Sequence, residues 1–338
     1  MLAISEQNAR YRHGGPSEYR ASVPKVIHVA NVLTHRQPYL DIKCQLGEGP
    51  LYISERNELR FVDIWNEKLY VVDLEKGPSS LREYDTGKPF GVTADIEGSD
   101  TEIVAGAKDG YVRFDLTTGK QEYLAKLWDQ DDNPDNTRIM RMNDGACDTS
   151  GRFWVGSCSD PKVIDFTDHG ILFRLDPDGS LHRMWEKITI PNGIQWNAKD
   201  DTMYMADGPT ERIWQWSIDP NTANIKDRRV FFHQNKYPGH LDGSAFDEEG
   251  YLWSALYGAG RVIRISPDGE VVGEILLPTR NITCPTFAGT VLYITTAAEE
   301  DPEKHAESAR YGGNLFRIDV GVKGMKKNKF RWNKQRYV

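Results

Sequence analysis

The stretch His240–Trp253 reads His-Leu-Asp-Gly-Ser-Ala-Phe-Asp-Glu-Glu-Gly-Tyr-Leu-Trp, and it decides the fold. An alternating run begins near Gly243, an acidic turn is closed by Gly250, and a second apolar run ends at Trp253. Period-two alternation bounded by Asp and Gly is typical of a β-hairpin. We therefore expect one strand before the turn and a returning strand after it.

The same hairpin pattern recurs from Leu46 onward, at intervals of roughly 40 to 55 residues, a spacing typical of solenoids and propellers. Apolar runs such as Arg228–Phe232 and Val271–Leu277 add a fourth strand to a copy. The six copies open at Glu48-Gly49, Phe90-Gly91, Asp144-Gly145, Asn192-Gly193, Asp242-Gly243 and, less clearly, near Pro285. The sequence thus predicts an all-β fold, a six-bladed β-propeller with four-stranded antiparallel blades around a central channel. A pair of β-sandwiches is the alternative, which the regular spacing disfavours.

The boundaries of the repeat suggest the domain organisation. Residues 1–45 are predicted to be an N-terminal lead-in extension and closing strand, because most of this segment shows no sustained period. Residues 46–338 are predicted to form a single six-bladed propeller domain. The four cysteines are far apart and form no CxxC pair, so we expect reduced core residues.

Charge and apolar content predict which binding partners and which cellular compartment the protein has. The formal net charge is -8 and no basic patch is present, so nucleic acid is not an expected partner. No window approaches the roughly 18 consecutive apolar residues of a spanning helix, so no membrane partner is expected. The polar N-terminus lacks the apolar core of a signal peptide, which predicts a cytoplasmic protein. A monomer or weak homo-oligomer is expected.

The residue before each shared glycine begins the innermost strand of its blade and should lie near the channel mouth. Four of the six copies carry an oxygen-bearing side chain there: Glu48, Asp144, Asn192 and Asp242. A local explanation is an Asx-type turn or strand cap, although Phe90 shows that the turn does not require one. Carboxylates brought together at a channel mouth repel one another unless a cation or a shared proton relieves them. Oxygen donors favour hard ions, and the lack of clustered His and Cys disfavours a thiolate-rich zinc site.

The segment Arg141-Met142-Asn143-Asp144-Gly145 places a guanidinium and an amide just ahead of the third opening. Such a pair can balance the charge of a carboxylate cluster or hold an anionic or hydroxyl-rich ligand. The alternative is a solvated loop arginine with no ligand.

These segments together resemble the regucalcin and gluconolactonase family, which is also named for senescence marker protein and luciferin-regenerating enzyme. The resemblance extends from Leu46 to about Lys327, and its specificity lies in the combination and order of the motifs. The motifs are Leu46-Gly47-Glu48-Gly49-Pro50, Phe61-Val62-Asp63-Ile64, Arg141-Met142-Asn143-Asp144-Gly145, Pro191-Asn192-Gly193, Leu241-Asp242-Gly243, Gly260-Arg261-Val262-Ile263-Arg264 and Gly321-Val322-Lys323-Gly324.

The resemblance implies a six-bladed propeller whose channel holds one divalent metal ion on Glu48, Asn192 and Asp242. Calcium is the preferred ion, with zinc, magnesium, manganese or iron as alternatives. It also implies that Arg141 and Asn143 bind substrate, and it leaves Asp144 to contact metal-bound water or to support its loop.

The implied activity is hydrolysis of a small-molecule sugar lactone to the aldonic acid. Polarisation of the carbonyl by the metal and assistance of water attack by Asp242 are the implied catalytic steps. The alternatives are a non-enzymatic calcium-binding or interaction propeller and a phosphotriester hydrolase, which the same metal could serve.

One departure from the family pattern bears on the substrate. Some sugar-lactone members carry a lid glutamate in the loop after the outer part of the third copy, where this sequence has Phe166. Asp165, Phe166, Asp168 and His169 are therefore candidates for lining the pocket. For His169 alone, a packed or solvent-facing loop position is the expectation.

Overall fold

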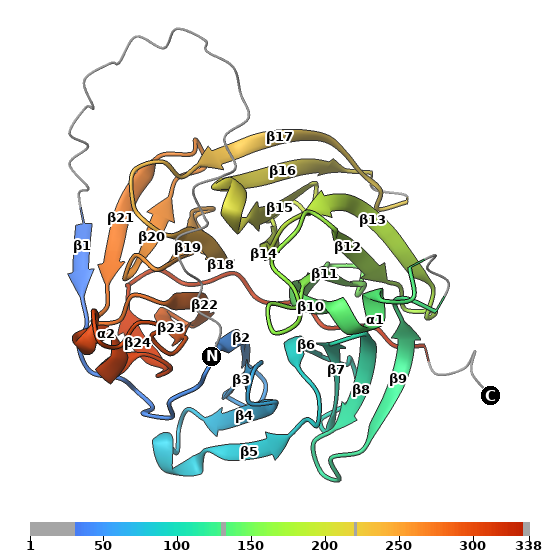
Figure 1. The fold of residues 1–338 in the computed structure, drawn as a ribbon, viewed down its shortest axis with the longest axis horizontal. Helices are drawn as coiled ribbons and strands as arrows, with labels where there is room; N and C mark the ends of the chain where they lie inside the picture. The colour runs from blue at the N-terminus through green and yellow to red at the C-terminus, as the bar shows by residue number, and fades with distance from the viewer. Residues whose placement is uncertain (1–30, 130–132, 220–221, 334–338) are drawn as a thin grey trace, which may run out of the picture.

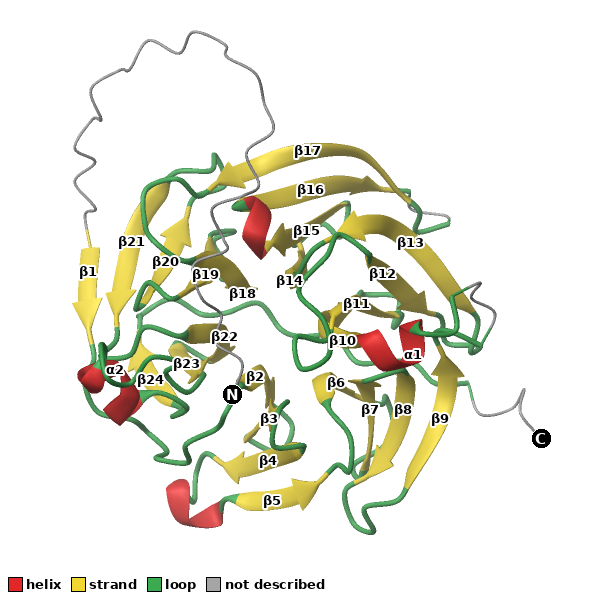
Figure 2. Ribbon diagram, in the orientation of Figure 1, coloured by secondary structure: helices red, strands yellow, loops and turns green. Residues whose placement is uncertain are grey.

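The structure, a computed structural model, describes residues 31–129, 133–219 and 222–333. Its strands form six sheets arranged around a central channel (Figure 1). The predicted six-bladed propeller with four-stranded antiparallel blades is confirmed. Among the described residues, strands dominate and the few helices are short connections between them (Figure 2).

Each blade is built from strands that follow one another in the chain, with the first strand innermost. Blades one to three contain β2 (Gly47–Ile53), β3 (Glu58–Asp63), β4 (Lys68–Asp73) and β5 (Arg82–Asp85); β6 (Phe90–Asp95), β7 (Glu102–Ala107), β8 (Gly110–Asp115) and β9 (Gln121–Lys126); and β10 (Met140–Cys147), β11 (Phe153–Ser159), β12 (Gly170–Leu175) and β13 (Leu181–Ile188).

Blades four to six contain β14 (Pro191–Trp196), β15 (Thr202–Asp207), β16 (Arg212–Ile218) and β17 (Ile225–His233); β18 (His240–Phe246), β19 (Leu252–Tyr257), β20 (Arg261–Ile265) and β21 (Val271–Leu276); and β22 (Ile282–Ala288), β23 (Val291–Thr296) and β24 (Phe316–Asp319). The helical turns are η2 (Pro78–Ser80), α1 (Asn136–Ile139), η3 (Gly208–Thr210) and α2 (Ala306–Tyr311).

The N-terminal segment contacts the last two blades. Strand β1 (Asn31–Thr34) pairs in parallel with β21, so the fifth sheet has five strands. The sixth sheet has three strands, and Leu40 forms an antiparallel bridge with Leu315 just before β24. The described part of the lead-in therefore joins the outer edge of blade five and the region of blade six.

Apolar side chains fill the spaces between neighbouring blades, as strand alternation requires. One cluster joins Trp154 of blade three to Trp196 and Trp216 of blade four. Two blades share a buried hydrogen bond, which the aspartate of a turn accepts from a tryptophan six residues later. Trp154 donates to Asp148 and Trp253 donates to Asp247, both at 2.9 Å, which ties each turn to the core.

The four cysteines are free and buried, in agreement with the prediction. No helix in the described ranges is long and apolar enough to cross a membrane.

A C-terminal strap, defined here as residues 320–333, follows the last blade and crosses the channel (Figure 1). The backbone N–H of Met325 donates to Phe246 O at the end of β18, and that of Phe330 donates to Asp95 O at the end of β6. Between these points, Asn328 Nδ2 donates to Cys147 O at the end of β10. Because these partners are the last residues of inner strands, the strap covers the end of the channel opposite the openings of the strands.

Candidate functional site

All six inner strands share a register shift where they begin. The shift falls at Glu48/Leu51, Phe90/Val92, Met142/Gly145, Asn192/Gln195, Leu241/Ser244 and Ile282/Pro285. A β-bulge bends its strand and redirects a side chain. In blades one and four the glycine after the opening residue has a positive φ, 54° at Gly49 and 57° at Gly193, which other residues rarely adopt. The repeated X-Gly pair of the sequence is thus the signature of a bulge.

Three of the opening residues are acidic and buried. The exposed fractions are 6% for Glu48, 8% for Asp144 and 7% for Asp242. Glu48 and Asp242 accept hydrogen bonds from the N–H of the glycine that follows them, both at 3.0 Å. The two carboxyl groups are also close enough for each to shift the pKa of the other. Strands from blades one and five thereby bring two interacting carboxyl groups together in the channel.

Asp144 connects the opening of blade three to that of blade four. Its Oδ1 accepts from Gly145 N at 2.7 Å, and its Oδ2 accepts from Gly193 N at 2.6 Å. Gly193 follows Asn192, so the position of Asp144 is coupled to that of the blade-four bulge. The sequence prediction that Asp144 supports its loop agrees with these contacts, and the structure adds that it supports the neighbouring blade.

Burial raises the pKa of all three acids, and neighbouring carboxylates raise it further for Glu48 and Asp242. Burial raises the pKa of Glu48 well above its usual range, and the carboxyl groups of Asp242 and Asp144 raise it further. Burial and then Asp144 raise the pKa of Asp242 in the same way. The pKa of Asp144 is also raised by burial, against the hydrogen bonds from the two glycine N–H groups. The channel therefore concentrates negative charge that a proton or a cation would stabilise.

A chain of polar side chains joins blade three to blade four. Arg141 Nη1 donates to Asn143 Oδ1 at 2.7 Å, and Asn143 Nδ2 donates to Asn192 Oδ1 at 2.8 Å. Arg141 is 4% exposed, so the solvated loop arginine considered above is excluded. Its Nε is buried and has no hydrogen-bond partner within the described ranges. A buried guanidinium with a free donor is suited to bind a ligand oxygen.

The structure thus brings together the five residues that the resemblance assigns to metal or substrate: Glu48, Arg141, Asn143, Asn192 and Asp242. In the described part of the chain, no three Asp, Glu, His or Cys side chains meet in a metal-ligand arrangement. A cation in the channel would have to use the amide oxygen of Asn192 beside two carboxylates. A donor set of hard oxygens fits calcium and similar divalent ions.

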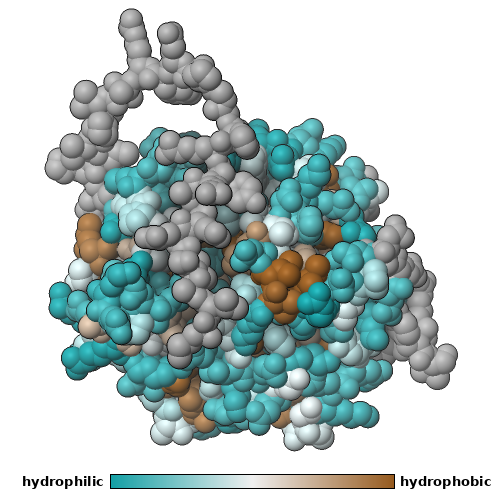
Figure 3. All heavy atoms as spheres, viewed as in Figure 1, coloured by the Kyte–Doolittle hydropathy of each residue, from teal (hydrophilic) through white to brown (hydrophobic). Residues whose placement is uncertain are grey.

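The loop between β11 and β12 lies beside the channel mouth. Lys162 Nζ donates to Trp65 O at 3.1 Å, so this loop of blade three reaches a loop of blade one. Asp165, Asp168 and His169 are exposed and Phe166 is half-buried. Their role as pocket-lining residues therefore stays a prediction, because no contact with the acids of the channel supports it in the described structure. Figure 3 shows that hydrophilic residues dominate the viewed face, with an apolar patch beside its centre.

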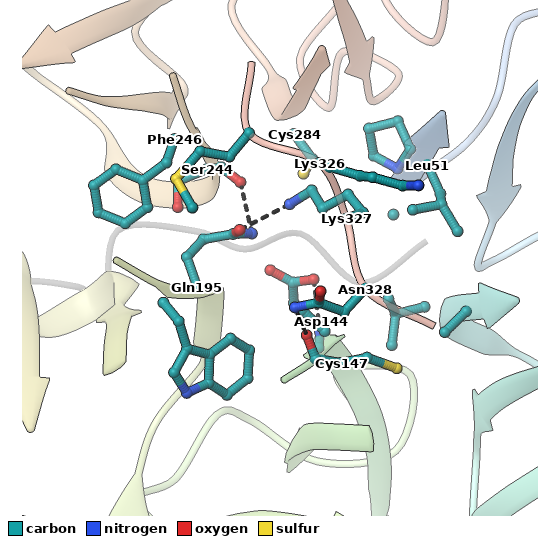
Figure 4. A pocket seen from close by; sticks show the side chains of 18 of the residues that line it. Leu51, Asp144, Cys147, Gln195, Ser244, Phe246, Cys284, Lys326, Lys327 and Asn328 are labelled. Atoms are coloured by element: carbon teal, nitrogen blue, oxygen red, sulfur yellow. Dashed lines mark hydrogen bonds between the residues drawn. The ribbon is translucent and has the colours of Figure 1, made fainter. Parts of the chain in front are cut away.

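Below the acids lies a chamber of about 130 Å³ that residues of the strap line on one side. Its polar lining includes Asp144, Gln195 and Ser244 from the blades and Lys327 and Asn328 from the strap (Figure 4). Lys327 Nζ donates to Gln195 Oε1 at 2.8 Å. Sequence reasoning did not predict this lysine, because the strap belongs to no blade and carries no repeat signal.

Comparisons with known proteins identify the family of this chain. The family described as the SMP-30/Gluconolactonase/LRE-like region matches residues 46–298. A 6-deoxy-6-sulfogluconolactonase of Pseudomonas putida is 30% identical over 82% of this chain and 92% of its own. The pentonolactonase XacC of Haloferax volcanii is 29% identical over 84% of this chain and 94% of its own.

Among solved structures, one of Agrobacterium tumefaciens described as the calcium-binding protein regucalcin superposes with a TM-score of 0.78. It is 25% identical and the match covers 90% of this chain and 99% of that one. Residues 46–298, which the family matches, contain strands β2 to β23 and the five channel residues Glu48, Arg141, Asn143, Asn192 and Asp242. The chain therefore belongs to the SMP-30, gluconolactonase and luciferin-regenerating enzyme-like family.

Proposed function

We propose that this protein is a divalent-metal-dependent lactonase that hydrolyses a sugar lactone to the aldonic acid. The observation that carries the proposal is a pair of buried carboxyl groups, Glu48 and Asp242, that interact with each other and with a buried arginine that has a free donor. The names of the two lactonase relatives agree with it.

We assign Glu48, Asn192 and Asp242 as the metal ligands, with calcium as the preferred ion. When bound, a divalent cation supplies Lewis-acid polarisation of the lactone carbonyl and charge stabilisation for the oxyanion that develops there. These oxygen donors suit a cation. The pKa values of the two buried carboxyl groups are raised, and a cation bound between the groups would relieve their repulsion.

Arg141 and Asn143 orient the substrate. Arg141 Nε has no partner within the described ranges and is the donor available to a hydroxyl or ring oxygen of the lactone. Asn143 is held by its bonds to Arg141 and Asn192, so its amide has a fixed orientation. Side chains with fixed orientations favour one orientation of the lactone ring, and they therefore position its carbonyl for attack.

Asp242 is assigned as the general base. It takes a proton from the attacking water as the water oxygen bonds to the acyl carbon, and it returns that proton to the ring oxygen as the ring C–O bond breaks. The products are a hydroxyl group and a carboxylic acid, which then loses its proton to water. Asp144 keeps the bulges of blades three and four in register through its bonds to Gly145 and Gly193. Asp242 thus acts both as a ligand and as a base.

A panel of gluconolactone, xylonolactone, galactonolactone and rhamnonolactone, each assayed with calcium and with a chelator, tests the proposal. Hydrolysis of at least one lactone that is lost with chelator and restored by calcium is expected. No turnover on any lactone by protein shown to contain metal would refute it.

A non-enzymatic calcium-binding propeller is the competing function, which the description of the Agrobacterium structure favours. Calcium affinity that no lactone changes, together with a binding partner retained by Asp242→Ala, would establish that alternative. A phosphotriester assayed beside the lactones ranks the remaining enzymatic possibility.

A further inference from the structure

Lys327 enters the channel from the end opposite the proposed substrate site. The strap that carries it is fixed on both sides, by Met325 to blade five and by Phe330 to blade two. Between these anchors the chain has little freedom to withdraw the side chain. Lys327 therefore has a defined place beneath the acids, although it lies in a segment without strands.

The surroundings of Lys327 are polar and enclosed. Its ammonium group donates to Gln195 Oε1, and Gln195 Nε2 donates in turn to Ser244 O, so two inner strands hold the group in place (Figure 4). Part of its surface faces the chamber that it shares with Asp144. Burial lowers the pKa of Lys327, while Cys284 and Asp144 act in the opposite direction. The electrostatic link to Asp144 connects the strap to the acid cluster.

Lys327 changes the net charge of the channel. The acids Glu48, Asp144 and Asp242 carry three negative charges when ionised, and Arg141 supplies one positive charge close to them. Lys327 supplies a second positive charge from below. Like charges repel, so a fixed cation under the acids opposes the entry of a divalent cation.

We propose that Lys327 is a positioning residue that sets the charge of the channel from below and so limits how tightly the carboxylates hold a divalent cation. This inference rests on the proposed function only in assuming that the acids bind such an ion. It predicts that removal of the lysine charge tightens metal binding, whereas simple damage to the channel would weaken it. The sign of the change therefore separates an electrostatic role from a structural one.

Lys326 provides a matched control. It is the adjacent residue of the same strap, its side chain is 74% exposed, and it lies 3.4 Å from Glu55 on the surface. Lys326→Met removes the same charge from the same segment without touching the Gln195 contact. Lys327→Arg retains a positive charge, because a guanidinium stays protonated in proteins.

The experiment is calcium titration calorimetry on the full chain, without lactone, for the wild-type protein and these variants. Lys327→Met should lower the calcium Kd by about tenfold, as expected for one charge acting on a divalent ion through a partly polar chamber. Lys327→Arg and Lys326→Met should stay within about threefold of wild type. An unchanged or higher Kd for Lys327→Met overturns the proposal.

Folding and the lactonase proposal are tested separately. If Lys327→Met does not fold, Lys327→Gln, whose amide can still donate a hydrogen bond, takes its place. If neither neutral variant folds while Lys327→Arg does, the lysine serves folding and the proposal fails. Absence of calcium binding to the wild-type protein would contradict the proposed metal dependence itself, whereas wild-type binding that Lys327→Met leaves unchanged contradicts only the role of Lys327.

Discussion

Gly91 controls the placement of the proposed substrate residues without belonging to them. It follows the opening residue of blade two, and its backbone lies against the strand of blade three. A Cβ atom at Gly91 would be 2.1 Å from Asn143 O and 2.7 Å from Met142 O. Both contacts are with backbone atoms, so a side-chain rotation cannot relieve them. Gly91→Ala must therefore push β6 and β10 apart.

The size of the displacement sets the expected effect. Cβ atoms essentially never approach backbone oxygens below 3.0 Å, so relief requires a shift of close to 1 Å at Asn143. A misplacement of about 1 Å can cost about 100-fold in rate. That factor corresponds to about 2.7 kcal/mol of transition-state stabilisation. We expect kcat/KM for the best lactone to fall by about 100-fold, with an overpacking cost of about 1 to 3 kcal/mol in stability.

Calcium affinity separates this effect from general damage. Glu48 and Asp242 lie on β2 and β18, whereas the three atoms nearest to the new methyl group all belong to β10, so the calcium Kd should change by less than about fivefold, or about 1 kcal/mol. Gly98→Ala is the control. A Cβ there meets no atom within 4 Å, but the positive φ of Gly98, 78°, strains an alanine at that position. That variant should lose stability but keep its activity. Activity of Gly91→Ala within threefold of wild type would refute the reasoning.

Three further predictions follow from the same structure. In the absence of metal, the raised pKa values of Glu48 and Asp242 mean that the folded state holds more protons than the unfolded state, so the contribution of these acids to stability falls as pH rises from the unfolded toward the folded pKa. The increase in Tm on adding calcium should therefore grow from about pH 5 to about pH 8 in thermal scans, and a flat profile would contradict the buried acid pair. Asp242→Asn should reduce lactone turnover by at least about 100-fold, and metal analysis of the same preparation shows whether the lost base or the lost ligand is responsible. Arg60→Met should destabilise the protein by about 3 kcal/mol in urea unfolding, because it removes a buried partner 2.6 Å from Asp95, while Lys76→Met on the surface should have no measurable effect.

The propeller could be predicted from the sequence because its information is local and repeated. In each blade, alternating apolar residues and turns with Asp and Gly predict the hairpins, as they do in the stretch ending at Trp253. The tie from Trp253 to Asp247 recurs in blade three, where Trp154 lies six residues after Asp148. The edges of the fold were harder to predict. Strand β1 pairs with β21 in parallel across most of the chain, and no local pattern encodes such a partner.

The candidate site could be predicted in its members but not in its connections. The oxygen-bearing opening residues were visible from the internal repeat, and the resemblance separated Asn143 from Asp144. The bond from Asp144 to Gly193 joins residues 49 positions apart, and it depends on the bulges of two blades. Lys327 comes from outside the repeat altogether, so comparison of the copies had nothing to align it with.

The differences among the six openings explain how a symmetric fold makes an asymmetric site. Phe90 of blade two is 1% exposed and packs edge-on against Phe114, so that blade contributes no oxygen. Its Gly91 instead makes room for Asn143, and in blade five Gly243 makes room for Cys284, whose Sγ would lie 2.3 Å from an added Cβ. Glycines of blades two and five thus supply space, blades one, three, four and five supply oxygens, and blade six supplies the Cys284 side chain that packs against Gly243. Restoring an acid at Phe90 would add charge while unpacking a core contact, so the asymmetry is maintained by the packing of the blades as well as by the chemistry of the channel.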